Sequence, residues 1–297
     1  MKTVGIMTDS HSSINPKEAR EKGIFVLPMP FYIDDECYYE NVNLTQAEFF
    51  EKMKGKAKVS TSQPSPEAVM QMWNEALKQY DELLYIPISS GLSGSCSTAF
   101  MLAQEDEYEG RVFVVDNGRV ATPLHRSILD AIELIEQGCS AREVKETLEK
   151  YREKTVVYIA VETLEYLKRG GRVSATSAVL GGLLNIKPIL KFDVGMLDVF
   201  QKCRGFVKAK HAMIDAMKHD LETVFEKEYA AGEVYLLAAT SATKEVTDAW
   251  IEEIRAAFPG MEVMCDELSL GVACHIGPGG LGIGCSCKPK RIGHKKE

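Results

Sequence analysis

The chain has 297 residues, of which 45% are hydrophobic and 26% charged, and its formal net charge at pH 7 is −8. These values describe an ordinary globular protein, and the length is about that of two domains. The negative charge argues against a nucleic-acid groove, and the apolar runs are shorter than the ~20 residues of a membrane helix. Asp9 interrupts the first apolar run, so we expect no secretory signal and a cytoplasmic protein without integral membrane association.

In the first half of the chain, short apolar runs alternate with segments of helical periodicity. Extended segments are expected at 3–9, 24–33, 83–88 and 111–116, and helices from Thr45, from Ser65, at 93–106, at 121–137 and from Ser140. The strands at 83–88 and 111–116 are apolar throughout, as in parallel sheets that are covered on both faces. This alternation predicts a doubly wound α/β domain over residues 1–157.

The pattern changes after a further strand at 155–161. A helix, a Gly-Gly break, a small-residue helix ("SATSAVLGGLL") and a strand follow, and then a hairpin across Asp193-Val194-Gly195. Two more strands flank a helix at 243–258. We therefore predict a second α/β domain over residues 158–297 with a mixed sheet, onto whose boundary the "HIGPG" segment at 275–279 packs back.

Polar side chains follow several of the predicted strands. Thr8-Asp9-Ser10, Thr61-Ser62-Gln63 and the loop Ser89–Ser95 all stand near strand ends. In open α/β sheets ligands bind at the carboxyl ends of the strands. The alternative is that these residues are helix caps or turn residues, as they usually are.

The loop Ser89–Ser95, "SSGLSGS", is compatible with three kinds of site. It matches no phosphate-binding glycine motif and lacks a lysine. It is one glycine short of a nucleophile elbow around Ser93, although His275 leaves a hydrolase open. Hydroxyls and backbone N–H groups at a helix N-terminus suit a carboxylate best.

Two other polar groups have both a structural and a functional interpretation. His275, before a Gly-Pro-Gly-Gly turn, is either a turn residue or an imidazole over a ligand head group. Arg169 and Arg172 flank a Gly-Gly break, where they either cap a helix or face an anion or an acidic partner. Cys285 and Cys287, with His275 and His294, lack the usual zinc spacing, so we expect reduced thiols and no metal.

Taken in order, seven elements of the sequence resemble the DegV family of bacterial fatty-acid-binding proteins. They are "TDSHSSI" at 8–14, "VLPMPFYI" at 26–33, "TSQPS" at 61–65, "SSGLSGS" at 89–95, "LEYLKRGGRVS" at 164–174, "LLNIKPIL" at 183–190 and "HIGPGGLG" at 275–282. The resemblance implies two α/β domains that hold one long-chain fatty acid, such as palmitate or stearate, between them.

The resemblance also implies roles for particular residues. It assigns the fatty-acid carboxylate to Thr61 and Ser93, places His275 near the head group, and puts Ser62, Gly94 and Ser95 in the same elements. It links Arg169, and with it Arg172, to a fatty acid kinase that converts the presented acid to an acyl-phosphate for phospholipid synthesis. The protein would then be a carrier without a cofactor and not an enzyme.

The sequence departs from the family pattern at residues 95–98, which read "SCST", and at 117–127, where a glycine-rich helix start is commoner. Both segments are expected to influence which acyl chain length and unsaturation the protein prefers. We expect neutral hydroxyls and a helix N-terminus to hold the carboxylate without a buried arginine. The alternatives are a serine hydrolase acting on acyl substrates through Ser93 and His275, and a regulatory lipid sensor.

Overall fold

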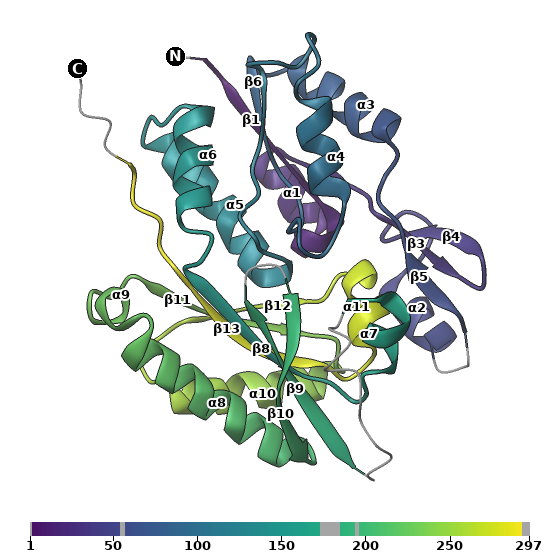
Figure 1. Cartoon of the computed structure of the whole chain (residues 1–297), viewed down its shortest axis with the longest axis vertical. Helices are drawn as coiled ribbons and strands as arrows, with labels where there is room; N and C mark the ends of the chain where they lie inside the picture. Colours follow the sequence, from purple (N-terminus) through teal and green to yellow (C-terminus); the bar gives the residue numbers. More distant parts are fainter. Residues whose placement is uncertain (1, 54–56, 173–184, 194–195, 293–297) are drawn as a thin grey trace.

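The computed structural model describes residues 2–53, 57–172, 185–193 and 196–292. These residues form a four-stranded sheet, a six-stranded sheet and a small three-stranded sheet. Figure 1 shows the four-stranded and six-stranded sheets one above the other, with the small sheet at the side of the molecule. The predicted small-residue helix at 174–184 and the hairpin turn at 194–195 lie outside the described residues.

The four-stranded sheet is wholly parallel, in the order β2-β1-β6-β7. Its strands and helices are β1 Val4–Asp9, β2 Ile24–Leu27, β6 Glu82–Ile86, β7 Val112–Val114, α1 Pro16–Lys22, α3 Pro66–Leu77, α4 Ser95–Leu102, α5 Ala121–Glu136 and α6 Ala141–Lys150. Helices α1, α5 and α6 share one hydrophobic core with the sheet, and α3 and α4 share another. The predicted doubly wound arrangement is confirmed.

Strand β6 explains why this part of the sequence is apolar without alternation. Leu84 and Ile86 belong to the core with α5 and α6, whereas Leu83 and Tyr85 belong to the core with α3 and α4. All five residues of β6 are buried. Since both faces of the strand are covered, Leu83, Leu84 and Ile86 are apolar without alternation.

The predicted helix starts are confirmed by their hydrogen bonds. Ser140 Oγ accepts from Glu143 N at 3.3 Å while the Glu143 carboxylate accepts from Ser140 N at 2.8 Å, which is a complete capping box. Thr45 and Glu48 form the same arrangement at the start of α2, Gln46–Met53. Ser65 caps α3 by accepting from Ala68 N at 3.2 Å.

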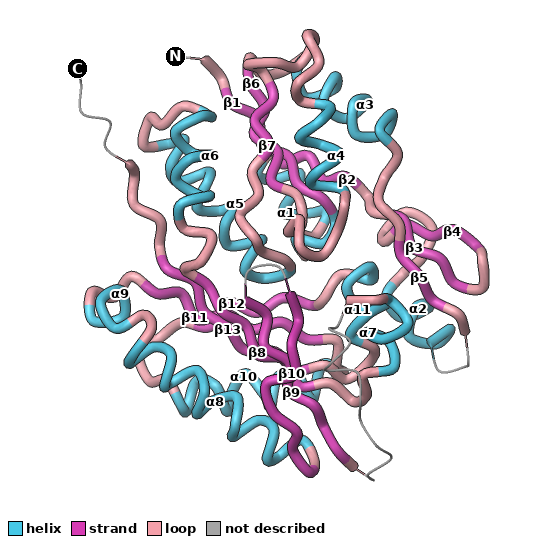
Figure 2. The backbone as a smooth tube through the Cα atoms, in the orientation of Figure 1, coloured by secondary structure: helices cyan, strands magenta, loops and turns pink. Residues whose placement is uncertain are grey.

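The extended segment expected at 24–33 is in fact two strands of different sheets. β2 ends at Leu27, and β3, Pro30–Ile33, pairs with β4, Glu36–Tyr39, and β5, Val59–Thr61. Pro28 and Pro30 lie at the break, and a proline has no N–H to continue a ladder. The chain therefore leaves the first sheet here and builds the small one (Figure 2).

The six-stranded sheet has the order β10-β9-β8-β13-β11-β12 and is mixed, because β11 and β12 are parallel and the other pairs antiparallel. Its elements are β8 Thr155–Ala160, β9 Ile186–Asp193, β10 Met196–Arg204, β11 Val234–Thr240, β12 Val263–Glu267, β13 Leu281–Cys287, α7 Glu165–Gly170, α8 Phe206–Thr223, α9 Glu226–Ala230, α10 Lys244–Ala257 and α11 Leu270–Ile276. The predicted mixed sheet is confirmed. Residue 157, where we drew the boundary, lies inside β8.

Helix α5 lies between the two large sheets (Figure 1). One face of α5 packs in the core of the parallel sheet. On the other side, Thr122 Oγ1 donates to the carbonyl of Ala238 in β11 at 2.7 Å. The outer face of the six-stranded sheet is covered by α8 and α10. In the described part of the chain, no helix has both the length and the apolar run that crossing a membrane requires.

A candidate lipid-binding cavity

An apolar cavity lies where the carboxyl ends of the parallel strands approach the inner face of the six-stranded sheet. Its empty space, including the part that opens to solvent, is about 900 Å³. Aliphatic and aromatic side chains form most of the wall: Ile88, Leu92, Val120, Ala121, Pro123, Val157, Ile159, Phe192, Leu197, Ala239, Leu268, Val272 and Ile276. The polar lining is a short set, His11, Thr61, Ser62, Ser93, Arg172 and His275.

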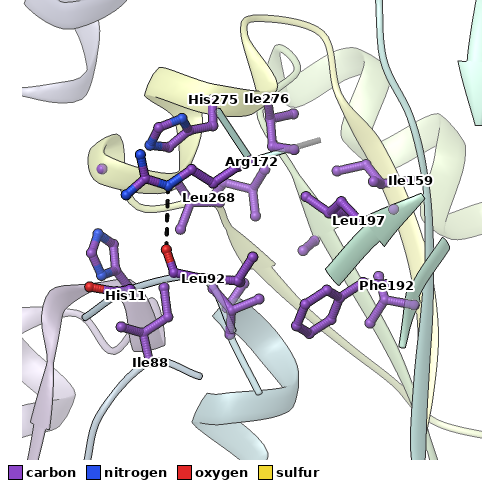
Figure 3. A pocket seen from close by; sticks show the side chains of 18 of the residues that line it. His11, Ile88, Leu92, Ile159, Arg172, Phe192, Leu197, Leu268, His275 and Ile276 are labelled. Carbon is purple, nitrogen blue, oxygen red and sulfur yellow. Dashed lines mark hydrogen bonds between the residues drawn. The ribbon is translucent and has the colours of Figure 1, made fainter. Parts of the chain in front are cut away.

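The polar lining residues gather at one end of the cavity. Figure 3 shows His11, Arg172 and His275 together at one end, and Ile159, Phe192 and Leu197 at the other. The apolar wall follows from strand periodicity, because Val156, Tyr158 and Ala160 face α8 and α10 while Ile159 faces the cavity. A ligand that fits this arrangement has a polar head and an apolar body.

Ser93 lies on the loop after β6, and its hydroxyl oxygen accepts two hydrogen bonds from Ser95. Ser95 donates to Ser93 Oγ from its backbone N at 3.2 Å and from its hydroxyl at 3.0 Å. No described residue accepts a hydrogen bond from the Ser93 hydroxyl, which lines the cavity. Its own hydrogen is therefore available to a ligand acceptor.

Thr61 and His275 meet at the same end of the cavity. Thr61 ends β5 of the small sheet, and His275 lies in the last turn of α11. Thr61 Oγ1 and His275 Nε2 are 2.8 Å apart. If the imidazole N–H at Nε2 donates, the Thr61 hydroxyl hydrogen is free for a ligand, as at Ser93.

His275 is held in the neutral form. Burial lowers its pKa to about 3, with further lowering from the positive charge of Arg172 and from His11. The ring packs directly on the backbone of Gly170 in α7, where a Cβ atom would lie 2.0 Å from His275 Nδ1. Any side chain at position 170 would therefore displace the imidazole.

Arg172 lines the polar end of the cavity together with His11 and His275. Its Nε donates to the carbonyl of Leu92 at 3.3 Å (Figure 3), and its Nη1 donates to the carbonyl of Gly170. Both partners are uncharged carbonyls, so the guanidinium charge is open to an anion in the cavity. We expected the carboxylate to be held without a buried arginine; half-buried Arg172 nevertheless lines this end of the cavity.

His11 is a cavity residue that the sequence reasoning missed. It follows β1 in a short 3-10 helix, η1 (Ser10–Ser12), where Asp9 accepts from its backbone N at 3.0 Å. The second Asp9 oxygen accepts from Ile88 N at 2.8 Å, which ties the ends of β1 and β6 together. The polar run Thr8-Asp9-Ser10 at a strand end was the signal, and His11 stands directly after it.

The structure separates the remaining predicted site residues into two groups. Ser62 lines the cavity, whereas Ser95 is buried behind Ser93 and Gly94 is exposed on the loop. Arg169 is exposed and pairs with Glu165 at 3.1 Å, away from the cavity lining. Of the two arginines named as partner-binding residues, Arg172 thus lies in the cavity and only Arg169 on the open surface.

The groups considered for zinc do not meet. Cys285 and Cys287 are buried in β13, His275 is bonded to Thr61, and His294 lies outside the described residues. Within the ranges that the structure describes, no three histidine, cysteine or acidic side chains are placed to bind a metal.

Fold and cavity together define a class of protein: two sheets joined across an internal apolar cavity that ends in hydroxyl, imidazole and guanidinium groups. The sequence model of the DegV family, described as uncharacterised protein, matches residues 3–288. A DegV domain-containing protein of Deinococcus radiodurans is 33% identical over 285 residues, which are 95% of this chain and 97% of the relative. The chain belongs to the DegV family.

Solved structures of the family have the same fold. A DegV family protein from Thermus thermophilus, described as binding fatty acid, is 32% identical, with a TM-score of 0.84 over 96% of this chain and 99% of its own. DegV of Bacillus subtilis, described as a fatty acid binding protein, is 27% identical, with a TM-score of 0.83 over 97% of this chain and 100% of its own.

Proposed function

We propose that this protein binds one long-chain fatty acid, with the acyl chain in the apolar part of the cavity and the carboxylate at its polar end. The observation that carries the proposal is the gathering of the polar lining residues at one end. The Ser93 hydroxyl hydrogen has no acceptor among the described residues, the Thr61 hydroxyl hydrogen is free when His275 Nε2 donates, and Arg172 adds a positive charge. The related proteins described as fatty-acid-binding support the same ligand class.

The expected energetics match this division. Each buried methylene contributes about 0.8 kcal/mol, so the tail supplies most of the affinity. A carboxylate that enters an apolar interior must keep its hydrogen bonds or become neutral. The hydroxyls of Ser93 and Thr61 and the guanidinium of Arg172 supply those bonds. The carboxylate therefore sets the orientation of the bound ligand, and the acyl chain supplies most of the binding free energy.

The serine hydrolase reading is the weaker one. Among the described residues His275 is hydrogen-bonded to Thr61 and Ser93 to Ser95, and Ser93 and His275 are not bonded to each other. A pKa of about 3 makes His275 a poor general base at neutral pH. His275 Nδ1 is buried without a partner among the described residues, so it lacks the carboxylate that orients a catalytic imidazole. We infer that the protein carries its ligand without cleaving it.

The finer proposal is that the carried acid is presented to a fatty acid kinase, which forms an acyl-phosphate. The position of the polar end supports it, because His275 at that end packs on Gly170, the residue next to exposed Arg169. Arg169 would then contact the kinase.

Two assays test these proposals separately. Titration of delipidated protein with stearate should show saturable one-to-one binding, and its absence would refute the binding proposal. With a fatty acid kinase from the same genome and ATP, hydroxylamine should trap acyl-phosphate only when the loaded protein is present. Binding without acyl-phosphate would leave a binding protein that is not a kinase substrate carrier, as the lipid-sensor alternative requires.

A further inference from the structure

Two loops contribute lining residues to the cavity. The loop after β6 carries Leu92 and Ser93, and the segment after β7 leads to Val120 and Ala121. Both loops follow neighbouring parallel strands of the same sheet. The position of the Ser93 hydroxyl therefore depends on what holds these two loops together.

They are joined by a backbone hydrogen bond from Ser89 N to the carbonyl of Arg119 at 2.9 Å and by one carboxylate. Asp116, two residues after β7, accepts from Ser90 N at 3.3 Å and from Gly118 N at 3.3 Å with one oxygen. Its other oxygen accepts from the Ser90 hydroxyl at 2.5 Å. Asp116 thus binds both donors of Ser90 and closes its own loop at the same time.

The charge of the Asp116 carboxylate is balanced by Arg152. Arg152 Nη1 lies 2.8 Å from Asp116 Oδ2, and the Asp116 side chain is 12% exposed. Neither Asp116, Ser90 nor Arg152 is among the cavity-lining residues. The group therefore acts on a ligand only through the loops that it holds.

A few hydrogen bonds connect the loop that Asp116 holds to the cavity residues Leu92, Ser93 and Arg172. Ser89, next to Ser90, accepts from the backbone N of both Leu92 and Ser93, at 3.0 and 3.2 Å. Leu92 in turn accepts from Arg172 through its carbonyl. A shift at Ser90 moves the Ser93 hydroxyl and the acceptor of Arg172 together.

We propose that Asp116, neutralised by Arg152, is a positioning residue for head-group recognition, which it exerts through the Ser90 loop. This rests on the proposed fatty-acid function. Loss of the Asp116 carboxylate leaves the apolar wall formed by the six-stranded sheet and α11 in place but misplaces the groups that distinguish a carboxylate from other heads. The effect should fall on head-group discrimination and spare the contribution of the tail.

The chain offers a matched control at the other end of the same sheet. Asp81, just before β6, accepts from Thr3 N at 2.7 Å and from Thr3 Oγ1 at 2.9 Å. This is the same backbone-and-hydroxyl pair that Asp116 holds at Ser90. Because Asp81 lies at the amino ends of the strands, its removal costs similar hydrogen bonds without touching the cavity loops.

The experiment measures equilibrium binding of myristate and of 1-tetradecanol to delipidated D116A, D116N, R152Q, D81A and wild type. Wild type should prefer the acid, and D116A should reduce the acid-to-alcohol affinity ratio at least about fivefold, as lost hydrogen bonds to a charged group would. D116N and R152Q should reduce it less, and D81A should keep the wild-type ratio. If D116A fails to fold, D116N and R152Q still measure the effect on the acid-to-alcohol affinity ratio.

An unchanged ratio in the folded Asp116 variants, or an equal fall in D81A, would overturn the positioning role. If wild type binds neither ligand, the fatty-acid proposal itself fails. If wild type binds both and the Asp116 variants keep its ratio, only the positioning role fails.

Discussion

The imidazole of His275 and the hydroxyl of Thr61 are joined by a contact of 2.8 Å between Nε2 and Oγ1, although the two residues are 214 positions apart. The contact links the small sheet to α11, which lines the cavity on one face and packs against the small sheet with the other. The polar end is assembled from five separate parts of the chain, because His11, the Ser93 loop and Arg172 join Thr61 and His275 there.

Replacing Ser93 with alanine should weaken fatty-acid retention. The change removes a hydroxyl that we place on the ligand carboxylate, and hydrogen bonds to charged groups are worth about 1.5–3 kcal/mol, which is roughly tenfold or more in affinity. The matched control is S97A, an exposed serine in the first turn of α4, the helix that follows the Ser93 loop. Stearate titration of both variants measures the difference, and equal affinities would remove Ser93 from the site.

His275 should make the protein less stable in acid. Its folded-state pKa of about 3 lies below the ordinary 6.5, so the unfolded chain binds the extra proton between these values. The contribution is complete above pH 6.5 and is lost as the pH falls toward 3, at about 1.4 kcal/mol per pH unit.

Urea unfolding of wild type and H275Q between pH 4 and 7 isolates this effect, since other titrating groups are common to both proteins. The free energy of unfolding should fall more steeply with acid in wild type than in H275Q. Parallel curves would show that His275 is not held neutral.

Arg172 should act on both the ligand and His275. Its charge lowers the pKa of His275, so R172Q should raise that pKa, and it should also weaken stearate binding because a charge near the carboxylate is lost. The exposed Arg169, in the next turn back, provides the control R169Q. NMR titration of the imidazole and stearate binding test the two effects, and identical behaviour of the two variants contradicts the account.

Ala121 should be strained. It begins α5 with a φ of 52°, a region that L-residues adopt at a cost of roughly 1–3 kcal/mol. A121G should therefore raise the free energy of unfolding, by about 1 kcal/mol after the entropy cost of glycine. The control A131G, at a buried position within the same helix, should lower it by about 1 kcal/mol or more. Destabilisation by both changes would argue against strain at Ala121.

Much of the fold was predictable because its local signals agree with its tertiary structure. The capping boxes at Ser140 and Thr45 and the apolar run of β6 each coincide with an observed element. The split of 24–33 into two strands was missed because both halves are apolar and extended. Only Pro28 and Pro30 marked the break, and prolines also occur in edge strands.

The cavity was less predictable than the fold. Thr61 and Ser93 stand near strand ends and His275 precedes a glycine turn, but only the resemblance to the family linked these three residues to a carboxylate. Phe192 and Leu197 could not, since an apolar residue in a strand looks the same whether it faces a helix or a cavity. The place of Arg172 depends on where the chain goes after Gly170, which no local pattern specifies.

The central claim is most directly tested by native mass spectrometry of the purified protein, followed by organic extraction and identification of what it carries. The account predicts one free long-chain fatty acid per chain, intact and not esterified, which is lost or reduced in S93A. A folded protein that carries no lipid and takes up no added palmitate or stearate would contradict it.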